Sequence, residues 1–166
     1  MQKNAEFWIE KLGLKTHPEG GYFKETYRSD EQIDKSALPS RYTGSRSFGT
    51  SVYFLIQDED PSRFHRLQSD EVWHFYAGSP MTLYIITPDG ELETKTLGPD
   101  PDKGHEFQAV VYKYCWFGAL VEDKNGFSLV GCNIAPGFDF DDFELGEKAE
   151  LKKQFPNQAE IIEKLS

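Results

Sequence analysis

The stretch FHRLQSDEVWHFYAG, residues 64–78, holds two short hydrophobic and aromatic runs on either side of a polar turn. The content and length of these runs predict one strand over Arg63–Leu67 and a second over Glu71–Ala77. Because side chains alternate across a strand, every second residue of each run can face a common interior. His65 in the first strand and Glu71 in the second are therefore candidates for one shared site.

The β pattern continues through most of the chain. Six further runs predict strands at Thr50–Gln57, Met81–Ile86, Leu92–Leu97, Phe107–Val111, Trp116–Val121 and Phe127–Ala135. Turn residues separate the runs, and Asn125-Gly126 between two hydrophobic runs indicates a hairpin. Many short strands at near-even spacing indicate an all-β sandwich or barrel.

Helices are expected only near the two ends of the chain. Asn4 is a plausible N-cap for a first helix that ends at Gly13. A second helix is predicted over Glu147–Phe155, and a third from Asn157, where Glu160 completes a capping-box pattern. No repeat, linker or low-complexity tract divides the sequence, so we expect a single domain over residues 1–166.

Composition and charge narrow the classes of partner. The formal net charge of −10 disfavours nucleic acid and anionic membrane surfaces, both of which require clustered cations. The longest near-apolar run, Val52–Ile56, is far shorter than the roughly 20 residues of a membrane span. No secretory signal is visible in residues 1–7, and the two cysteines imply no disulfide framework. These features favour a soluble, reduced, cytoplasmic protein.

Three blocks of sequence carry a family resemblance. They are EGGYF at 19–23, SRFHRLQSDEVWHFYAG at 62–78, and LVGC at 129–132 leading into APGFDFDDFEL at 135–145. Together with the strand order, these blocks resemble the cupin superfamily, and more closely an uncharacterised branch grouped with the RmlC-like cupins. The resemblance implies a double-stranded β-helix, or jelly-roll barrel, with a short N-terminal helix and C-terminal helices.

The resemblance also identifies the positions where cupins hold a metal. Cupin motifs supply three histidines and one glutamate, and here His65 and Glu71 fill two of those positions. Leu67 and Phe117 occupy the positions of the two missing histidines. Because a catalytic transition metal generally takes three protein ligands, we predict no metal site and no cofactor.

The surviving pair suits acid–base chemistry. An imidazole such as His65 can move a proton near neutral pH, and the carboxylate of Glu71 can orient the ring and raise its pKa. The structural alternative is a satisfied buried pair that joins two strands without catalysis.

Other residues are candidates for ligand contacts. Arg46 can hold a carboxylate or phosphate as a bidentate fork, although arginines in loops are more often solvated charges. Ser51 and Tyr53 share one strand face and can point their hydroxyl groups inward, with Tyr53 as a candidate catalytic residue. We expect three aromatic residues either to line the pocket or to pack in the core: Trp73, Phe75 and Phe117.

Two further expectations concern the surroundings of the barrel. The polar, irregular segment Ser29–Ser47 is long enough to be a lid, a binding arm or a disordered loop. The resemblance implies a homodimer, with Phe23–Arg28 as an edge strand exchanged between subunits.

Several functions remain open. The first hypothesis is a barrel that binds a sugar, a nucleotide-sugar or a small metabolite without a complete metal site. The second is a metal-independent epimerase or isomerase in which His65 abstracts a proton, Glu71 orients it and Tyr53 returns a proton on the other face. A metal-dependent cupin enzyme and a non-catalytic interaction protein are further alternatives.

Overall fold

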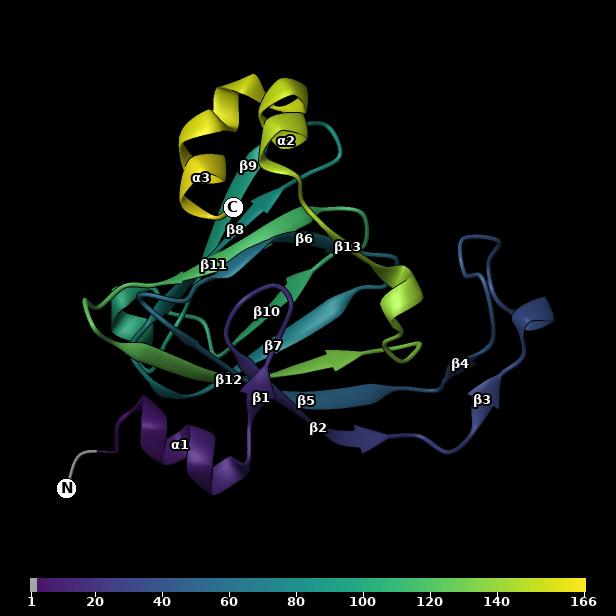
Figure 1. Ribbon diagram of the computed structural model, residues 1–166, viewed down its shortest axis with the longest axis horizontal. Helices are drawn as coiled ribbons and strands as arrows, with labels where there is room; N and C mark the ends of the chain where they lie inside the picture. Colours follow the sequence, from purple (N-terminus) through teal and green to yellow (C-terminus); the bar gives the residue numbers. More distant parts are fainter. Residues whose placement is uncertain (1–2) are drawn as a thin grey trace.

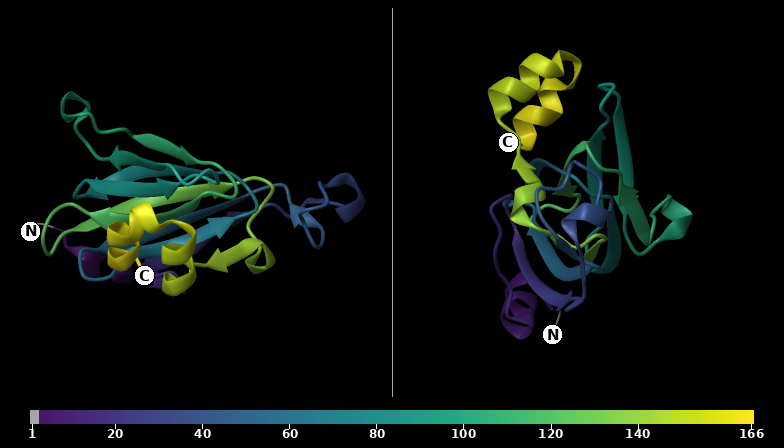
Figure 2. Two further views of the ribbon diagram at one scale, coloured as in Figure 1. Left: turned by 90° about the horizontal axis from the view of Figure 1, so that it is seen from above. Right: turned by 90° about the vertical axis from the view of Figure 1, so that its right-hand side faces the viewer.

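Two antiparallel β-sheets packed face to face form the body of the protein in a computed structural model that describes residues 3–166 (Figures 1 and 2). The first sheet contains, in spatial order, β1 (Lys15–Thr16), β2 (Tyr22–Arg28), β5 (Thr50–Gln57), β12 (Phe127–Ile134), β7 (Glu71–Gly78) and β10 (Gln108–Val111). The second contains β13 (Phe143–Leu145), β6 (Ser62–Leu67), β11 (Trp116–Val121), β8 (Met81–Ile86) and β9 (Leu92–Leu97). This jelly-roll arrangement confirms the predicted fold class.

The strands predicted from sequence are present. β5, β8, β9 and β11 begin and end at the predicted residues, and β6, β7, β10 and β12 differ from the prediction by one residue at one end. β1, β13 and the two short strands within segment 29–47 were not predicted, because a strand of two or three residues has too few alternations to show a pattern.

Alternation along β5 separates an interior face from an exterior face. Phe54 and Ile56 point between the sheets, where they join a buried cluster that includes Trp73 and Phe117. Leu55 points the opposite way and packs under the first helix. Both faces of β5 are therefore covered, and its sequence reads as nearly continuous hydrophobic residues.

Helices cover the outer faces of both sheets (Figure 1). Helix α1 (Ala5–Leu12) lies against the six-stranded sheet, and α2 (Lys148–Gln154) and α3 (Ala159–Lys164) lie against the five-stranded sheet. Single 3-10 turns complete the chain: η1 (Lys35–Ala37), η2 (Pro101–Lys103), η3 (Phe140–Asp142) and η4 (Pro156–Gln158). Within the described residues, no helix has the length and apolar character needed to cross a membrane.

Two local predictions were wrong. Asn125-Gly126 forms a turn, with Asn125 in the left-handed region at φ 56°, but the strands on either side belong to different sheets and do not pair. The turn thus passes from one sheet to the other instead of closing a hairpin. Asn157 lies inside η4, and α3 begins two residues later at Ala159, so Asn157 does not cap that helix.

The segment 29–47 forms a projecting arm that extends away from the sheets in Figures 1 and 2. Its short strands β3 (Gln32–Ile33) and β4 (Arg46–Ser47) pair with each other. At its base the ring of Tyr42 is buried, and its hydroxyl group lies 2.7 Å from the Oγ of Ser69. The arm is therefore ordered and anchored at its base.

Candidate functional site

A cavity of about 290 Å³ lies between the two sheets, where the ends of β2 and β5 meet η3. Its interior part is formed by buried residues that include Glu19, His65 and Glu71. Much of its wall is aromatic, formed by Phe23, Phe54, Trp73, Phe138, Phe140 and Phe143. The volume is near the lower end of the range for small-molecule sites, and the mixture of apolar walls and few polar groups is typical of them.

The turn before β2 directs Glu19 into this interior. Gly20 and Gly21 both have positive φ, 107° and 69°, which favours glycine. A Cβ atom on Gly20 would lie 2.2 Å from the carbonyl oxygen of Pro61, so the turn packs directly against the chain that enters β6. The backbone N–H of Arg63 donates to the carbonyl oxygen of Glu19 at 2.8 Å and fixes the turn to β6.

Three side chains surround the Glu19 carboxyl group. The hydroxyl group of Ser62 donates to Oε1 at 2.7 Å. On the other oxygen, Oε2 lies 3.2 Å from Nε2 of His65 and 3.3 Å from Nδ1 of His17. The carboxyl group is thus held by residues from β6 and from its own turn.

The hydrogen bonds around His65 determine where its protons lie. Nδ1 of His65 is 2.7 Å from the backbone carbonyl oxygen of Arg63, and a carbonyl can only accept, so Nδ1 carries a proton. Nδ1 of His17 accepts from the backbone N–H of Glu19 at 3.3 Å, so it has no proton to give. A neutral His65 therefore presents a lone pair at Nε2, and its contact with Glu19 requires one proton shared between the two groups.

Burial places that proton mainly on the carboxyl group. Burial raises the pKa of Glu19 to about 7, with His17 and Ser62 opposing the rise. Burial also lowers the pKa of His65 to about 4, against the hydrogen bond from its ring to Arg63. Near neutral pH, His65 is therefore a neutral imidazole, and the carboxyl group of Glu19 is close to its own pKa, so it can both gain and lose a proton. When Glu19 is protonated, one hydrogen bond joins it to Nε2 of His65.

Glu71 is the second buried carboxyl group of the cavity. The indole N–H of Trp73 donates to its Oε2 at 2.9 Å. Burial, and next the proximity of Glu19, raise the pKa of Glu71 to about 8, while hydrogen bonds from Trp73 and Cys132 lower it. This carboxyl group also keeps a proton at neutral pH.

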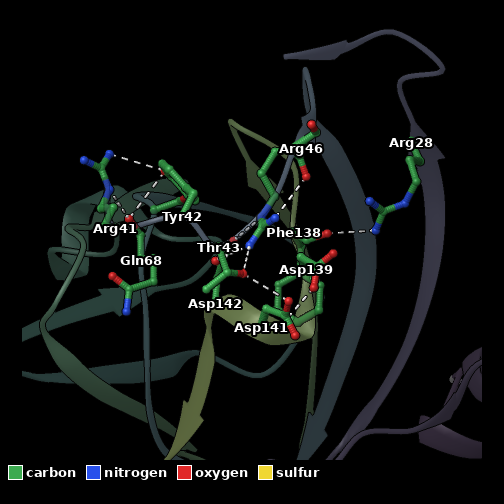
Figure 3. Close-up of polar contacts among 12 residues, drawn as sticks. Arg28, Arg41, Tyr42, Thr43, Arg46, Gln68, Phe138, Asp139, Asp141 and Asp142 are labelled. Atoms are coloured by element: carbon green, nitrogen blue, oxygen red, sulfur yellow. Dashed lines mark hydrogen bonds and ion pairs between the residues drawn. The ribbon is translucent and has the colours of Figure 1, made fainter. Parts of the chain in front are cut away.

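The rim of the cavity is more exposed than its interior. Arg28 lies there with its guanidinium group already engaged: Nε and Nη2 donate to the Glu25 carboxylate at 3.0 and 2.8 Å, and Nη2 also donates to the carbonyl oxygen of Phe138 at 3.0 Å. Asp139 and the half-exposed ring of Phe140 complete this side. Figure 3 shows Arg28 reaching across to the segment that carries these residues.

Of the predicted site residues, the structure brings His65, Glu71 and Trp73 to the cavity. The ring of Phe117 packs against His65 with centroids 4.1 Å apart, so it supports the imidazole from within the core. Phe75 packs against the same core but does not line the cavity. The carboxyl group that contacts His65 is Glu19, and not Glu71 as predicted.

Three other predicted site residues lie away from the cavity. Val52 lines the cavity, so its neighbours Ser51 and Tyr53 face the opposite side of β5, where Tyr53 packs near α1 and Tyr76. Their assignment to the interior was therefore wrong. Arg46 is buried, but it forms a two-pronged ion pair with Asp142, with both N–O distances 2.7 Å (Figure 3). Its charge is used within the protein, so it cannot serve as the predicted anion fork.

Sequence reasoning missed Glu19 and His17. Both lie in a turn, and nothing in their spacing relates them to His65 in β6. The available signal was the acidic residue directly before two glycines, a pattern that allows the backbone to press against another segment and turn a side chain inward.

The residues present do not fit the metal that cupin motifs imply. The positions of two ligands hold Leu67 and Phe117, both buried and apolar. Nδ1 of His17 already accepts a backbone hydrogen bond, as described above. Across residues 3–166, no group of three or more histidine, cysteine, aspartate or glutamate side chains is arranged to hold a metal ion.

Comparisons with known proteins agree on the family. The family model described as "Cupin superfamily (DUF985)" matches residues 6–146. The uncharacterized protein YML079W of Saccharomyces cerevisiae is 31% identical over 156 residues, which cover 87% of this chain and 76% of the yeast protein.

Solved structures extend the likeness to the fold. Protein SO0799 from Shewanella oneidensis is 43% identical with a TM-score of 0.90, covering 100% of this chain and 98% of its own. A hypothetical protein from Leishmania major is 34% identical with a TM-score of 0.89, covering 98% of each chain. Oxalate decarboxylase from Bacillus subtilis, at 12% identity and a TM-score of 0.55, covers 91% of this chain and 36% of its own, and shares the fold alone.

Proposed function

The chain belongs to the cupin superfamily, and on that premise we propose that it binds a small organic molecule in the cavity between its sheets. The observation that carries this proposal is the group Glu19, His65 and Glu71, three buried ionisable side chains inside an otherwise aromatic cavity. Burying ionisable groups costs free energy, so a protein with no use for the cavity gains stability by filling it with apolar side chains. Binding of a ligand offsets that cost.

The size of the cavity limits the ligand. About 290 Å³ accommodates a sugar ring or a small metabolite, which are two of the ligand types predicted from the sequence. A nucleotide-sugar fits only with its nucleotide part outside the rim. Arg28 is the cationic side chain at that rim, and it is already paired with Glu25. We therefore favour the sugar or small metabolite over the nucleotide-sugar.

A pair of variants on adjacent residues tests the proposal. Val52→Phe places a ring in the cavity, and Ser51→Phe places the same ring on the opposite face of β5. We expect a metabolite library to contain compounds that raise the melting temperature of the wild type and of Ser51→Phe but not of Val52→Phe. A library without any hit on the wild type, or hits that persist fully in Val52→Phe, would contradict the proposal.

The shared proton between Glu19 and His65 favours a second candidate function, metal-independent isomerisation of a carbonyl compound. In this reaction a C–H bond next to the carbonyl breaks, and its proton passes to ionised Glu19, which then shares it with Nε2 of His65. The electron pair of that bond forms a C=C bond while Glu71 gives its proton to the carbonyl oxygen. Glu19 then returns a proton to carbon while the enol oxygen gives its proton back to Glu71, which restores a carbonyl group and both carboxyl groups of the protein. Tyr53, on the outer face, has no part in it.

Deuterium incorporation tests this second function. Dihydroxyacetone, fructose and a keto-sugar nucleotide are incubated with the protein in D₂O, and exchange of the C–H next to the carbonyl is followed by NMR. We expect exchange with at least one compound, and a loss of at least 100-fold in Glu19→Gln. The control variant Glu10→Gln removes an exposed carboxylate on α1 and should exchange at the wild-type rate. Binding of these ketones without any exchange rules out the isomerase.

We also propose that the protein is a homodimer and that residues 1–166 fold as one domain. β2 pairs with β5 of its own chain along one edge, while its other edge pairs with only two residues of β1. The exposed half from Lys24 to Arg28 is therefore an open edge, which proteins usually cover. Light scattering at micromolar concentration should give twice the chain mass, and urea should produce one unfolding transition. A monomeric mass or two separate transitions would disprove the corresponding part.

A further inference from the structure

We infer that the ligand of this cavity is an organic ammonium ion, an amine on a ring-shaped or apolar body, whose charged nitrogen lies beside Glu71. The inference rests on the proposed binding function and specifies the chemical class of its ligand. Three features of the cavity support it: the distribution of charge, the missing counter-ion of Glu71 and the aromatic walls.

The titratable groups around the cavity are predominantly acidic. Glu19 and Glu71 lie in the interior, and Glu25 and Asp139 lie at the rim. The cationic residue among those that line the cavity is Arg28, which is bound to Glu25 and to a backbone carbonyl. Together with the net charge of −10 of the whole chain, this arrangement attracts cations and repels anions.

Glu71 is a buried carboxyl group without a positive partner. Its carboxyl group accepts hydrogen bonds from the indole N–H of Trp73 and from the thiol of Cys132, and both of these donors are neutral. Among residues 3–166, no lysine, arginine or histidine nitrogen lies within ion-pair distance of it. Near neutral pH the carboxyl group therefore keeps its proton, because the protein provides no cation that would favour its ionised form. An ammonium group supplies that cation.

The aromatic residues that line the cavity suit a cationic ligand. The ring of Trp73 crosses that of Phe54 edge to face, with centroids 5.7 Å apart, and both line the cavity. Aromatic rings attract ammonium groups through their negative faces. The same rings pack against an apolar or ring-shaped body. Phe138 and Phe140, whose ring centroids are 4.9 Å apart, extend this aromatic surface to the rim.

Binding of an amine should expel a proton from Glu71, because the ammonium ion favours the ionised carboxylate. Of the other titratable and charged groups that line the cavity, Glu19 and Cys132 act on Glu71 directly. The rest are His17, His65, Glu25, Arg28 and Asp139. From the pKa of about 8 for Glu71, the uptake of an ammonium ion should release roughly one proton at pH 7 and about a tenth of a proton at pH 9. The affinity should accordingly rise about tenfold between pH 6 and pH 7.

Three probes with the same ring test the inference by isothermal titration calorimetry: benzylamine, benzyl alcohol and benzoate. For the wild type at pH 8, we expect benzylamine to bind at least tenfold more tightly than benzyl alcohol, and benzoate to give no heat. Repeating the benzylamine titration at pH 7 in buffers of different ionisation enthalpy measures the released proton without any variant.

The variant Glu71→Gln keeps an oxygen for the Trp73 indole but cannot ionise. It should lower the affinity for benzylamine at least tenfold and leave the affinity for benzyl alcohol within threefold, whereas the control Glu10→Gln should change neither. The inference is wrong if benzyl alcohol or benzoate binds as tightly as benzylamine, if Glu71→Gln binds benzylamine like the wild type, or if none of the probes binds. In each case a sugar or metabolite that binds the wild type but not Val52→Phe would leave the proposed binding function intact.

Discussion

Replacing Glu71 with glutamine should change the pH dependence of stability more than the stability at any single pH. The side chain is buried, and glutamine preserves its shape and an acceptor for the Trp73 N–H. The substitution therefore removes mainly the ability to bind and release a proton. The consequence depends on how differently Glu71 holds that proton in the folded and unfolded chains.

Folding raises the pKa of Glu71 from an ordinary value of 4.5 to about 8. The folded protein thus binds more protons than the unfolded chain between these values, so the contribution of Glu71 is fully present below pH 4.5 and is lost as the pH rises through 8. At about 1.4 kcal/mol per unit of pKa, the whole loss is about 5 kcal/mol, of which about 4 kcal/mol falls between pH 5 and pH 9. Glu19 and His65 titrate in both proteins, and the substitution affects Glu19 only through its repulsion with Glu71, which is a smaller cause of the Glu71 shift than burial.

Thermal unfolding of the wild type, Glu71→Gln and the surface control Glu10→Gln, followed by circular dichroism from pH 5 to pH 9, measures this difference. Relative to the wild type, Glu71→Gln should gain about 4 kcal/mol over that range, or roughly 8 to 16 °C in Tm for a chain of this size. The control should follow the wild type. If the curves for the wild type and Glu71→Gln run parallel, Glu71 does not hold a proton near neutral pH, and the reasoning about its environment fails.

Three other substitutions give clear expectations. Gly20→Ala should lower the unfolding free energy by about 2 to 4 kcal/mol in urea titrations, because a Cβ atom would meet the Pro61 carbonyl and φ is 107°; a loss below 0.5 kcal/mol would contradict this. Arg46→Met should cost about 3 to 5 kcal/mol by leaving the Asp142 carboxylate unpaired, and the double variant Arg46→Met/Asp142→Leu should recover most of it; an equally unstable double variant would argue against the buried ion pair. Tyr53→Phe should leave binding of any cavity ligand unchanged in calorimetry, and a loss greater than threefold would restore this residue to the site.

The strands were predictable because their information is local. In β8, β9 and β11 the runs of residues between turns fix both the type of the element and its ends. The hairpin prediction at Asn125-Gly126 was wrong about which strands pair with each other, and local sequence does not determine that pairing. A short turn with positive φ is compatible with a hairpin and with passage between two sheets, and packing of the whole barrel decides between them.

The site was less predictable because its contacts join distant segments. Glu19 reaches Ser62 across 43 residues, and Arg46 reaches Asp142 across 96, and neither separation leaves a periodic trace. The face of β5 was also ambiguous, since α1 covers the exterior and makes both faces apolar. From the sequence alone, either Tyr53 or Val52 could face the interior, and the packing of α1 against the outer face decides that it is Val52.

The base of the arm and the rim of the cavity are fastened to each other. Besides the Arg46 ion pair, the hydroxyl group of Thr43 donates to Asp141 at 3.1 Å, and both acids belong to η3, whose Phe140 lines the opening. For a ligand bound as proposed, the residence time should consequently depend on side chains that do not contact it. A mutational screen for faster release of that ligand should yield substitutions at the base of the arm as well as in the wall of the cavity.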